Sequence, residues 1–193
     1  MEPQAQEARV LDAAEELFYA RGLQAVGMDA IRTASGVSLK RLYQLFPSKD
    51  ALVEAYLLRR DQRWRAELAH YAAARPAGGE RVLAVFDWLH HWFARPGFRG
   101  CAFVNSYGEL GPAHPGVTAA ARSHKAAVRR YLTELVAEAG VPAPVAGQIA
   151  LLAEGAITTA AVSGDAAVAR EAREAARVLL AHGGGGAADA DRR

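Results

Sequence analysis

The sequence predicts an all-α protein of about nine helices. Its 193 residues include 44 alanines and 19 leucines but only 15 valines and 3 isoleucines. Helices favour alanine and leucine, whereas strands favour β-branched residues. Apolar side chains also recur along most of the chain at the spacing of one helix face. The length is sufficient to bury a core in one or two small domains.

Charge and cysteine content exclude several classes of protein. The 23 lysines and arginines nearly balance the 21 aspartates and glutamates, so the chain is neither histone-like nor built around an acidic tail. The single cysteine, Cys101, excludes an internal disulfide and a zinc site made of two cysteine pairs. No uncharged apolar run approaches the ~18 residues of a membrane span, and the polar residues 1–10 do not resemble a signal peptide. We therefore expect a soluble, cytoplasmic protein without a membrane partner.

The first three predicted helices lie close together in sequence, and the second and third are short. The first carries an apolar stripe that includes Val10 and Phe18, and it ends at Gly22, a residue suited to a helix C-terminus. Helices over 28–35 and 39–46 follow. Two short helices joined by a glycine-containing turn and packed on a preceding helix describe a helix-turn-helix unit.

Small residues mark the turn and the start of the next helix. Gly36 permits the backbone of a tight turn, and Ser38 can cap the helix that follows it. Ser48 is the expected cap of a long fourth helix, which runs to about residue 74. That helix carries a cluster of arginines, which we interpret as solvated charges, although they could extend a basic surface: Arg59, Arg60, Arg63 and Arg65.

Proline and glycine divide the remainder of the chain. Breakers lie at 75–79, 95–97 and 111–116. The intervening helices are expected at 82–93, 101–110, 117–139, 143–163 and 166–181. The low-complexity residues 183–193 are expected to be disordered.

The third helix has a polar face suited to reading DNA. Residues 21–49 carry a net charge of +4, whereas residues 1–20 carry −4. Lys40 and Gln44 share one face, opposite an apolar face, and Arg41 flanks them. Lysine and arginine can donate to guanine, and glutamine matches the hydrogen-bonding edge of adenine. The simpler alternative is a solvated polar face.

A longer pattern extends through this region. An Ile-x-x-Ala-x-Gly-Val-Ser turn runs into a Leu-Tyr-x-x-Phe-x-x-Lys-x-x-Leu segment, here at Ile31, Ala34, Gly36, Val37, Ser38, Leu42, Tyr43, Phe46, Lys49 and Leu52. This pattern resembles the N-terminal domain of TetR-family (tetracycline-repressor-like) transcriptional regulators. The resemblance covers residues 8–58 or so, and residues 98–132 resemble the regulatory domain of one branch of the family. It implies an all-α dimer with a ligand-binding C-terminal domain.

The resemblance also implies specific DNA contacts. It places Leu39, Lys40, Arg41, Tyr43 and Gln44 at the DNA surface, with Lys49 holding a phosphate beside a helix N-terminus. Where the family often has threonine or serine at the start of the second helix, this chain has Val26 and Gly27, which leaves only backbone N–H groups there. The expected domains are a helix-turn-helix DNA-binding domain at 1–47, a connecting helix and linker at 48–78, a ligand-binding and dimerisation domain at 79–182 and the tail at 183–193.

The predicted second domain concentrates aromatic and polar residues, as small-molecule sites do. The candidate ligand-binding residues, each of which could instead belong to the core, are Trp88, His91, Trp92, Phe103, Asn105, Tyr107 and His124. The histidines and Cys101 lack the spacing of a metal site. The chain also lacks a phosphate-binding glycine loop and the hydrolase motifs, so we expect no cofactor, no metal and no enzymatic activity.

The last two predicted helices are rich in small residues, which allow helices to pack closely. Paired with a second copy, they would form a four-helix dimer interface of the kind the family uses; packing within one chain is the alternative. The candidate interface residues are Ile149, Leu152, Ala153, Ala156, Ile157, Ala160, Ala175, Val178 and Leu179.

Together these features predict a homodimeric, ligand-responsive transcriptional regulator, more consistent with a repressor than with an activator. Its partners would be a pseudo-palindromic double-stranded DNA operator and a small-molecule effector that releases it. The alternative is a ligand-independent DNA-binding or interaction protein whose C-terminal domain serves only dimerisation.

Overall fold

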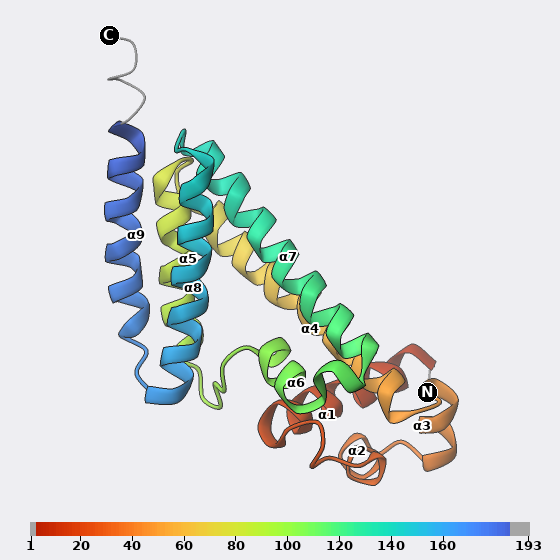
Figure 1. Ribbon diagram of the computed structural model, residues 1–193. Helices are drawn as coiled ribbons and strands as arrows, with labels where there is room; N and C mark the ends of the chain where they lie inside the picture. The colour runs from red at the N-terminus through yellow and green to blue at the C-terminus, as the bar shows by residue number, and fades with distance from the viewer. Residues whose placement is uncertain (1–2, 186–193) are drawn as a thin grey trace. The chain divides into compact units, whose positions relative to one another are not determined.

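The computed structural model describes residues 3–185, and over that range it contains helices and no strand (Figure 1). The helices are α1 (Pro3–Arg21), α2 (Met28–Ser35), α3 (Leu39–Leu45), α4 (Lys49–Ala73), α5 (Gly79–Phe93), α6 (Ala102–Leu110), a short 3₁₀ turn η1 (Gly111–Ala113), α7 (Pro115–Glu138), α8 (Ala143–Ser163) and α9 (Val168–Gly185). The prediction of an all-α fold is confirmed.

Local sequence signals account for several helix ends. Gly22 follows α1 in the left-handed conformation, at φ +89°, and its N–H donates to the Phe18 carbonyl at 2.9 Å. Ser38 caps α3 by accepting a hydrogen bond from the Arg41 N–H at 3.3 Å. Ser48 accepts from the Ala51 N–H at 3.1 Å at the start of α4. These caps are the ones the sequence predicts.

Gly36 forms the turn between α2 and α3. Its φ of +64° lies in the left-handed region, and its N–H donates to the Arg32 carbonyl at 3.0 Å. The Arg9 guanidinium of α1 donates to the neighbouring Ser35 carbonyl. A Cβ at position 36 would lie only 2.6 Å from Arg9 Nη2. The backbone angle therefore favours glycine at this position, and a larger residue would also displace the end of the Arg9 side chain.

The helices form two compact units. The N-terminal unit consists of the residues up to Arg63 together with Cys101–His124, and the C-terminal unit consists of Trp64–Gly100 together with the residues from Lys125 onward. α4 and α7 therefore contribute to both units. This division differs from the expected boundary at the 75–79 breaker, because α6 and the first part of α7 pack with the helix-turn-helix.

In the N-terminal unit, α1, α2, α3 and α4 pack around one apolar core. Val10, Ile31 and Leu42 are fully buried there, and the rings of Phe18 and Tyr56 lie 5.6 Å apart. Burial raises the pKa of Tyr56 well above its usual value, so its hydroxyl stays neutral.

Two polar contacts attach α6 to the loop between α1 and α2. The Gln24 N–H donates to Glu109 Oε2 at 2.9 Å, and Gln24 Nε2 donates to the Glu109 carbonyl at 2.6 Å. A Cβ on Gly22 would lie 2.9 Å from the Glu109 carboxylate. Glycine at position 22 therefore allows the close approach of α6, besides ending α1.

In the C-terminal unit, α5, α8 and α9 pack against one another side by side (Figure 1). Asp87 of α5 pairs with Arg173 of α9 at 2.9 Å. α9 continues through Gly185, three residues into the segment predicted to be a disordered tail. A Cβ on Gly183 would lie 2.6 Å from Val141 Cγ1, so the glycine lets the end of α9 pack closely on the loop before α8. The rest of the predicted tail, 186–193, lies outside the described residues.

α8 is apolar beyond what its buried face requires. By length and composition alone it could cross a membrane, and 39% of its most apolar window is buried within the structure. The helix contacts both α5 and α9, as expected for a core helix. Its exposed side nevertheless carries Leu151 and Val162, which are 74% and 87% exposed.

Candidate functional site

The outer face of α3 presents a compact set of exposed side chains. Leu42 is completely buried and anchors the helix on the core. On the opposite side Leu39 and Tyr43 are 44% and 46% exposed, and Lys40 and Gln44 are exposed beside them. Because residues four apart share a helix face, these side chains form two adjacent rows. The face has the donors and acceptors for base edges and two apolar groups for thymine methyls.

A side chain from α1 holds Arg41 at the edge of this face. Arg41 Nε donates to Gln6 Oε1 at 2.8 Å, and Arg41 Nη1 lies 3.5 Å from Gln44 Oε1. Arg41 is therefore a positioned charge, and it orients the Gln44 amide. Sequence reasoning missed Gln6, because it lies 35 residues before its partner and no short motif links the two.

The starts of α2 and α4 provide groups suited to phosphate. Lys49 is the first residue of α4 and is half-buried. Gly27, the N-cap of α2, has no side-chain cap hydrogen bond, so this helix offers backbone N–H groups, as the sequence indicates. Helix N-termini and a neighbouring lysine form a common binding arrangement for anions.

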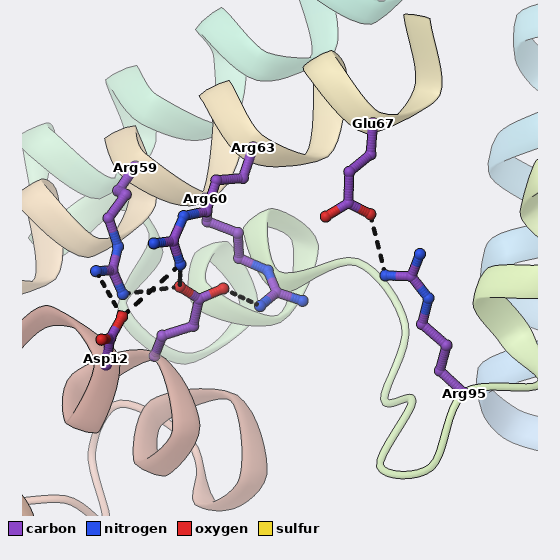
Figure 2. Close-up of polar contacts among 7 residues, drawn as sticks. Asp12, Arg59, Arg60, Arg63, Glu67 and Arg95 are labelled. Carbon is purple, nitrogen blue, oxygen red and sulfur yellow. Dashed lines mark hydrogen bonds and ion pairs between the residues drawn. The ribbon is translucent and has the colours of Figure 1, made fainter. Parts of the chain in front are cut away.

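Three of the four predicted arginines of α4 pair with carboxylates of α1. Arg59 Nη1 pairs with Asp12 at 2.9 Å, and Arg59 Nη2 pairs with Glu15 at 2.9 Å. Glu15 also accepts from Arg60 and Arg63, each at 3.2 Å. Figure 2 shows Asp12 of α1 beneath these three arginines of α4.

The side chains of Arg59 and Arg60 are only 15% and 13% exposed. The interpretation of these two residues as solvated is therefore wrong, because Glu15, whose side chain is 23% exposed, pairs with both of them against α4. We call Asp12, Glu15, Arg59, Arg60 and Arg63 the α1–α4 charge cluster. Figure 2 also draws a separate pair within the C-terminal unit, between Glu67 and Arg95 at 3.0 Å.

The C-terminal unit contains a partly open cavity of about 320 Å³, within the size range of small-molecule sites. Helices α4, α5, α7 and α8 contribute its lining. The lining residues are Trp64, Leu68, Val85, Leu89, Lys125, Val128, Arg129, Leu132, Gly147, Ala150, Leu151, Ala153, Glu154 and Ile157. The wall is mainly aliphatic, and three charged side chains interrupt it.

Three of the seven predicted ligand residues belong to the C-terminal unit, but they do not line this cavity. Trp88 and Trp92 are buried and stacked on each other, with ring centroids 5.6 Å apart. Trp88 also packs edge-to-face on Trp64, with ring centroids 4.8 Å apart, so it contacts a residue that lines the cavity. His91 is exposed and lies against Tyr71.

The other four predicted ligand residues belong to the N-terminal unit. His124 is buried and stacked on Phe103, with ring centroids 3.8 Å apart, and its Nδ1 lies 2.7 Å from Asp61 Oδ1. Asn105 and Tyr107 are exposed on α6. The seven residues therefore do not come together, and their aromatic members serve mainly as core.

The predicted dimer residues divide between the core and the surface. Ile149, Ala153, Ala156, Ile157 and Ala160 are each at most 6% exposed, because this stripe of α8 faces its own chain. Ala156 also lines the groove between α8 and α9, and a role for these five in an interface stays a prediction.

The remaining four predicted dimer residues lie at the surface. Val178 is 47% exposed, Ala175 is exposed, and Leu152 and Leu179 are half-buried. An open groove between α8 and α9 is lined by Leu152, Ala175 and Leu179, and also by Leu151, which was not predicted. We call this groove, together with Val178, the α8–α9 face.

No group of three histidine, cysteine or acidic side chains that could hold a metal occurs within residues 3–185. Cys101 is buried at the N-cap of α6.

Comparison with known proteins finds one family repeatedly. Residues 10–56 match the family model described as bacterial regulatory proteins of the tetR family. Over 75 residues the chain is 40% identical to an uncharacterized HTH-type transcriptional regulator of Mycobacterium tuberculosis strain H37Rv, a match that spans 39% of this chain and 37% of that protein.

Two solved structures are similar over nearly the whole chain. A TetR-family transcriptional regulator from Streptomyces coelicolor is 31% identical, with a TM-score of 0.85 over 94% of this chain and 97% of that chain. A TetR transcriptional regulator from Chloroflexus aurantiacus is 21% identical and shares the fold, with a TM-score of 0.81 over 93% of this chain and 96% of that chain.

Proposed function

The chain belongs to the TetR family of bacterial transcriptional regulators, and from that premise we propose that it is a cytoplasmic, ligand-responsive repressor. It binds a pseudo-palindromic operator as a homodimer, and a small molecule in the C-terminal unit releases it. The observation that carries the DNA-binding part is the exposed face of α3, with Lys40 and Gln44 in adjacent positions and Arg41 held at its edge.

In this proposal α3 enters the major groove, while the N-termini of α2 and α4 bind the phosphates on either side. Two copies related by two-fold symmetry place their α3 helices about one DNA turn apart, roughly 34–36 Å. The α8–α9 face supports the dimer, because it exposes large apolar side chains on helices that are otherwise well packed.

The cavity in the C-terminal unit favours a ligand-responsive protein over one whose C-terminal domain only dimerises. A purely structural helical unit has no need of a cavity of about 320 Å³ with charged groups on its wall. For the ligand to release DNA, it must bind the DNA-incompetent state more tightly than the DNA-bound state. Binding of the ligand and binding of DNA are therefore thermodynamically linked.

The proposal is tested by DNA binding to the region upstream of the protein's own gene, measured by fluorescence anisotropy at several salt concentrations. Unrelated DNA of equal length is the control. We expect tighter binding to the upstream fragment, with a difference that persists as salt rises. Equal binding to both fragments at every salt concentration would contradict an operator in that region, and no binding to either at low salt would contradict DNA binding itself.

Replacing Lys40 or Gln44 with alanine is expected to weaken operator binding by about 1–3 kcal/mol and to relax the preference at the contacted bases. The reason is the loss of hydrogen bonds to base edges, which carry sequence information. Anisotropy titrations against operator variants measure both effects. Leu58→Ala, at an exposed leucine of α4, is the control. Unchanged affinity in both test variants would mean that another surface reads the bases.

Lys49→Ala is expected to weaken all DNA sequences alike and to lower the slope of log affinity against log salt by about 1. A phosphate contact releases counterions on binding, whatever the base sequence. Arg75→Ala, which removes one positive charge from the C-terminal unit, serves as the control for net charge. A loss confined to the operator would show that Lys49 contacts bases instead.

A further inference from the structure

The wall of the cavity carries an excess of positive charge. Most of its lining is apolar, with Leu68, Val85 and Leu89 as fully or almost fully buried members. The only ionisable side chains among its lining residues are Lys125, Arg129 and Glu154. At neutral pH the set therefore carries one net positive charge.

Two of these charges compensate each other. Lys125 Nζ lies 2.5 Å from Glu154 Oε2, which joins α7 to α8 across the cavity wall. Their side chains are 31% and 37% exposed, so the pair lies between the cavity and solvent. A ligand that enters the cavity meets a pair that is already neutral as a unit.

Arg129 has no such compensation. It follows Lys125 by four residues on α7, so both project from the same side of that helix. Among the described residues no carboxylate pairs with its guanidinium. A Cβ built on Gly147 of α8 would lie 3.5 Å from Arg129 Nη2, so the group lies where α8 lacks a side chain. Its planar fork of donors suits bidentate recognition of a carboxylate.

We propose that the effector of this cavity is a largely apolar molecule that carries one negative charge, and that its acid group binds Arg129 beside the Lys125–Glu154 pair. The inference rests on the proposed ligand response and names the class of ligand. The Arg129 side chain is exposed, so water solvates its guanidinium in the free protein. A neutral molecule gains no charge-assisted hydrogen bond there, and a cation meets a positive wall. The apolar part of the ligand fills the space between α4, α5, α7 and α8.

Three probes of nearly equal shape test the charge of the ligand: 2-naphthoate, 2-naphthamide and 2-naphthylmethylammonium. Dissociation constants are measured by isothermal titration calorimetry on the full-length protein. We expect the acid to bind at least about tenfold more tightly than the amide, since hydrogen bonds to charged groups are the stronger ones. The ammonium compound should bind most weakly. Equal binding of acid and amide, or no binding of the acid, overturns the proposal.

Variants then locate the acid group. Arg129→Gln should remove the preference for the acid and leave the affinity of the amide unchanged. Glu154→Gln should tighten binding of the acid, because it removes the negative charge from the wall. Arg130→Gln is the matched control, at the next residue of α7, which is exposed and is not among the lining residues. Loss of acid and amide binding in equal proportion in Arg129→Gln would assign that residue a structural role and overturn the proposal.

Two further measurements separate this inference from the proposed function. Ala150→Phe fills the cavity and should abolish binding of all three probes; retained binding would place the probes elsewhere and overturn the proposal. DNA release is measured independently, by anisotropy in the presence of each probe. Preferred binding of the acid without DNA release supports the charge assignment and contradicts the ligand-responsive function. DNA release by the amide alone supports the ligand-responsive function and contradicts the charge assignment.

Discussion

Leu152→Glu is expected to convert the proposed dimer to a monomer and to weaken operator binding by about a hundredfold or more. Leu152 is half-buried in the groove of the α8–α9 face. If this groove forms the interface, the new carboxylate would be buried in an apolar setting without a partner, which strongly disfavours association. A monomer holds only one α3, so it loses the gain that comes from binding two half-sites at once.

Sedimentation velocity measures the mass, and anisotropy measures the affinity for the operator. Val178→Glu provides a second variant at a more exposed site, so that a folding defect in the first does not decide the outcome. Leu58→Glu, at an exposed leucine of α4 in the N-terminal unit, is the control and should remain dimeric. A dimer mass in both α8–α9 variants would place the interface on another face.

Glu15→Gln is expected to destabilise the N-terminal unit by about 2–3 kcal/mol. The substitution keeps the shape of the side chain but removes the charge that three arginines share. Arg59 and Arg60 are then left mostly buried with less compensation, and breaking such a pair costs more than the pair contributed. The cost lies below that of a fully buried pair, because both guanidinium groups retain some contact with water.

Urea unfolding followed by far-ultraviolet circular dichroism measures the change in the free energy of unfolding. Glu16→Gln is the matched control, since this neighbouring carboxylate of α1 is exposed. Equal stability of the two variants would show that the α1–α4 charge cluster contributes little to folding.

Local patterns were sufficient to predict most of the secondary structure and the helix-turn-helix. Helices at 28–35 and 143–163 have the predicted bounds, and Ser38 and Ser48 cap as expected. These features depend on neighbours within a few residues, where spacing and side-chain chemistry decide the outcome. The attachment of Glu109 to Gln24 could not be foreseen, because 85 residues separate the two.

The ligand cavity and the dimer face were harder to predict for a physical reason. Trp88 and Trp92 carry no sequence signal that separates a core aromatic from a ligand contact, and the structure stacks them in the core. A stripe of small residues on α8 predicts close helix packing but not whether the partner is the same chain or a second copy. Ala153 and Ile157 pack within the chain, while exposed Leu151 marks the outer side.

Gly36 has a consequence for how a signal can reach the DNA. Glycine is often equated with a hinge, but here the residue is held by its own hydrogen bond to Arg32, and the Arg9 guanidinium fixes the adjoining Ser35 carbonyl. The turn between α2 and α3 is therefore rigid, and the two helices form one rigid pair. Such a rigid pair does not lose its fit to DNA by an internal bend, so it would leave the DNA by moving as a whole. In the proposed dimer, release of DNA would therefore change the separation and tilt of the two α2–α3 pairs and not the shape of either pair.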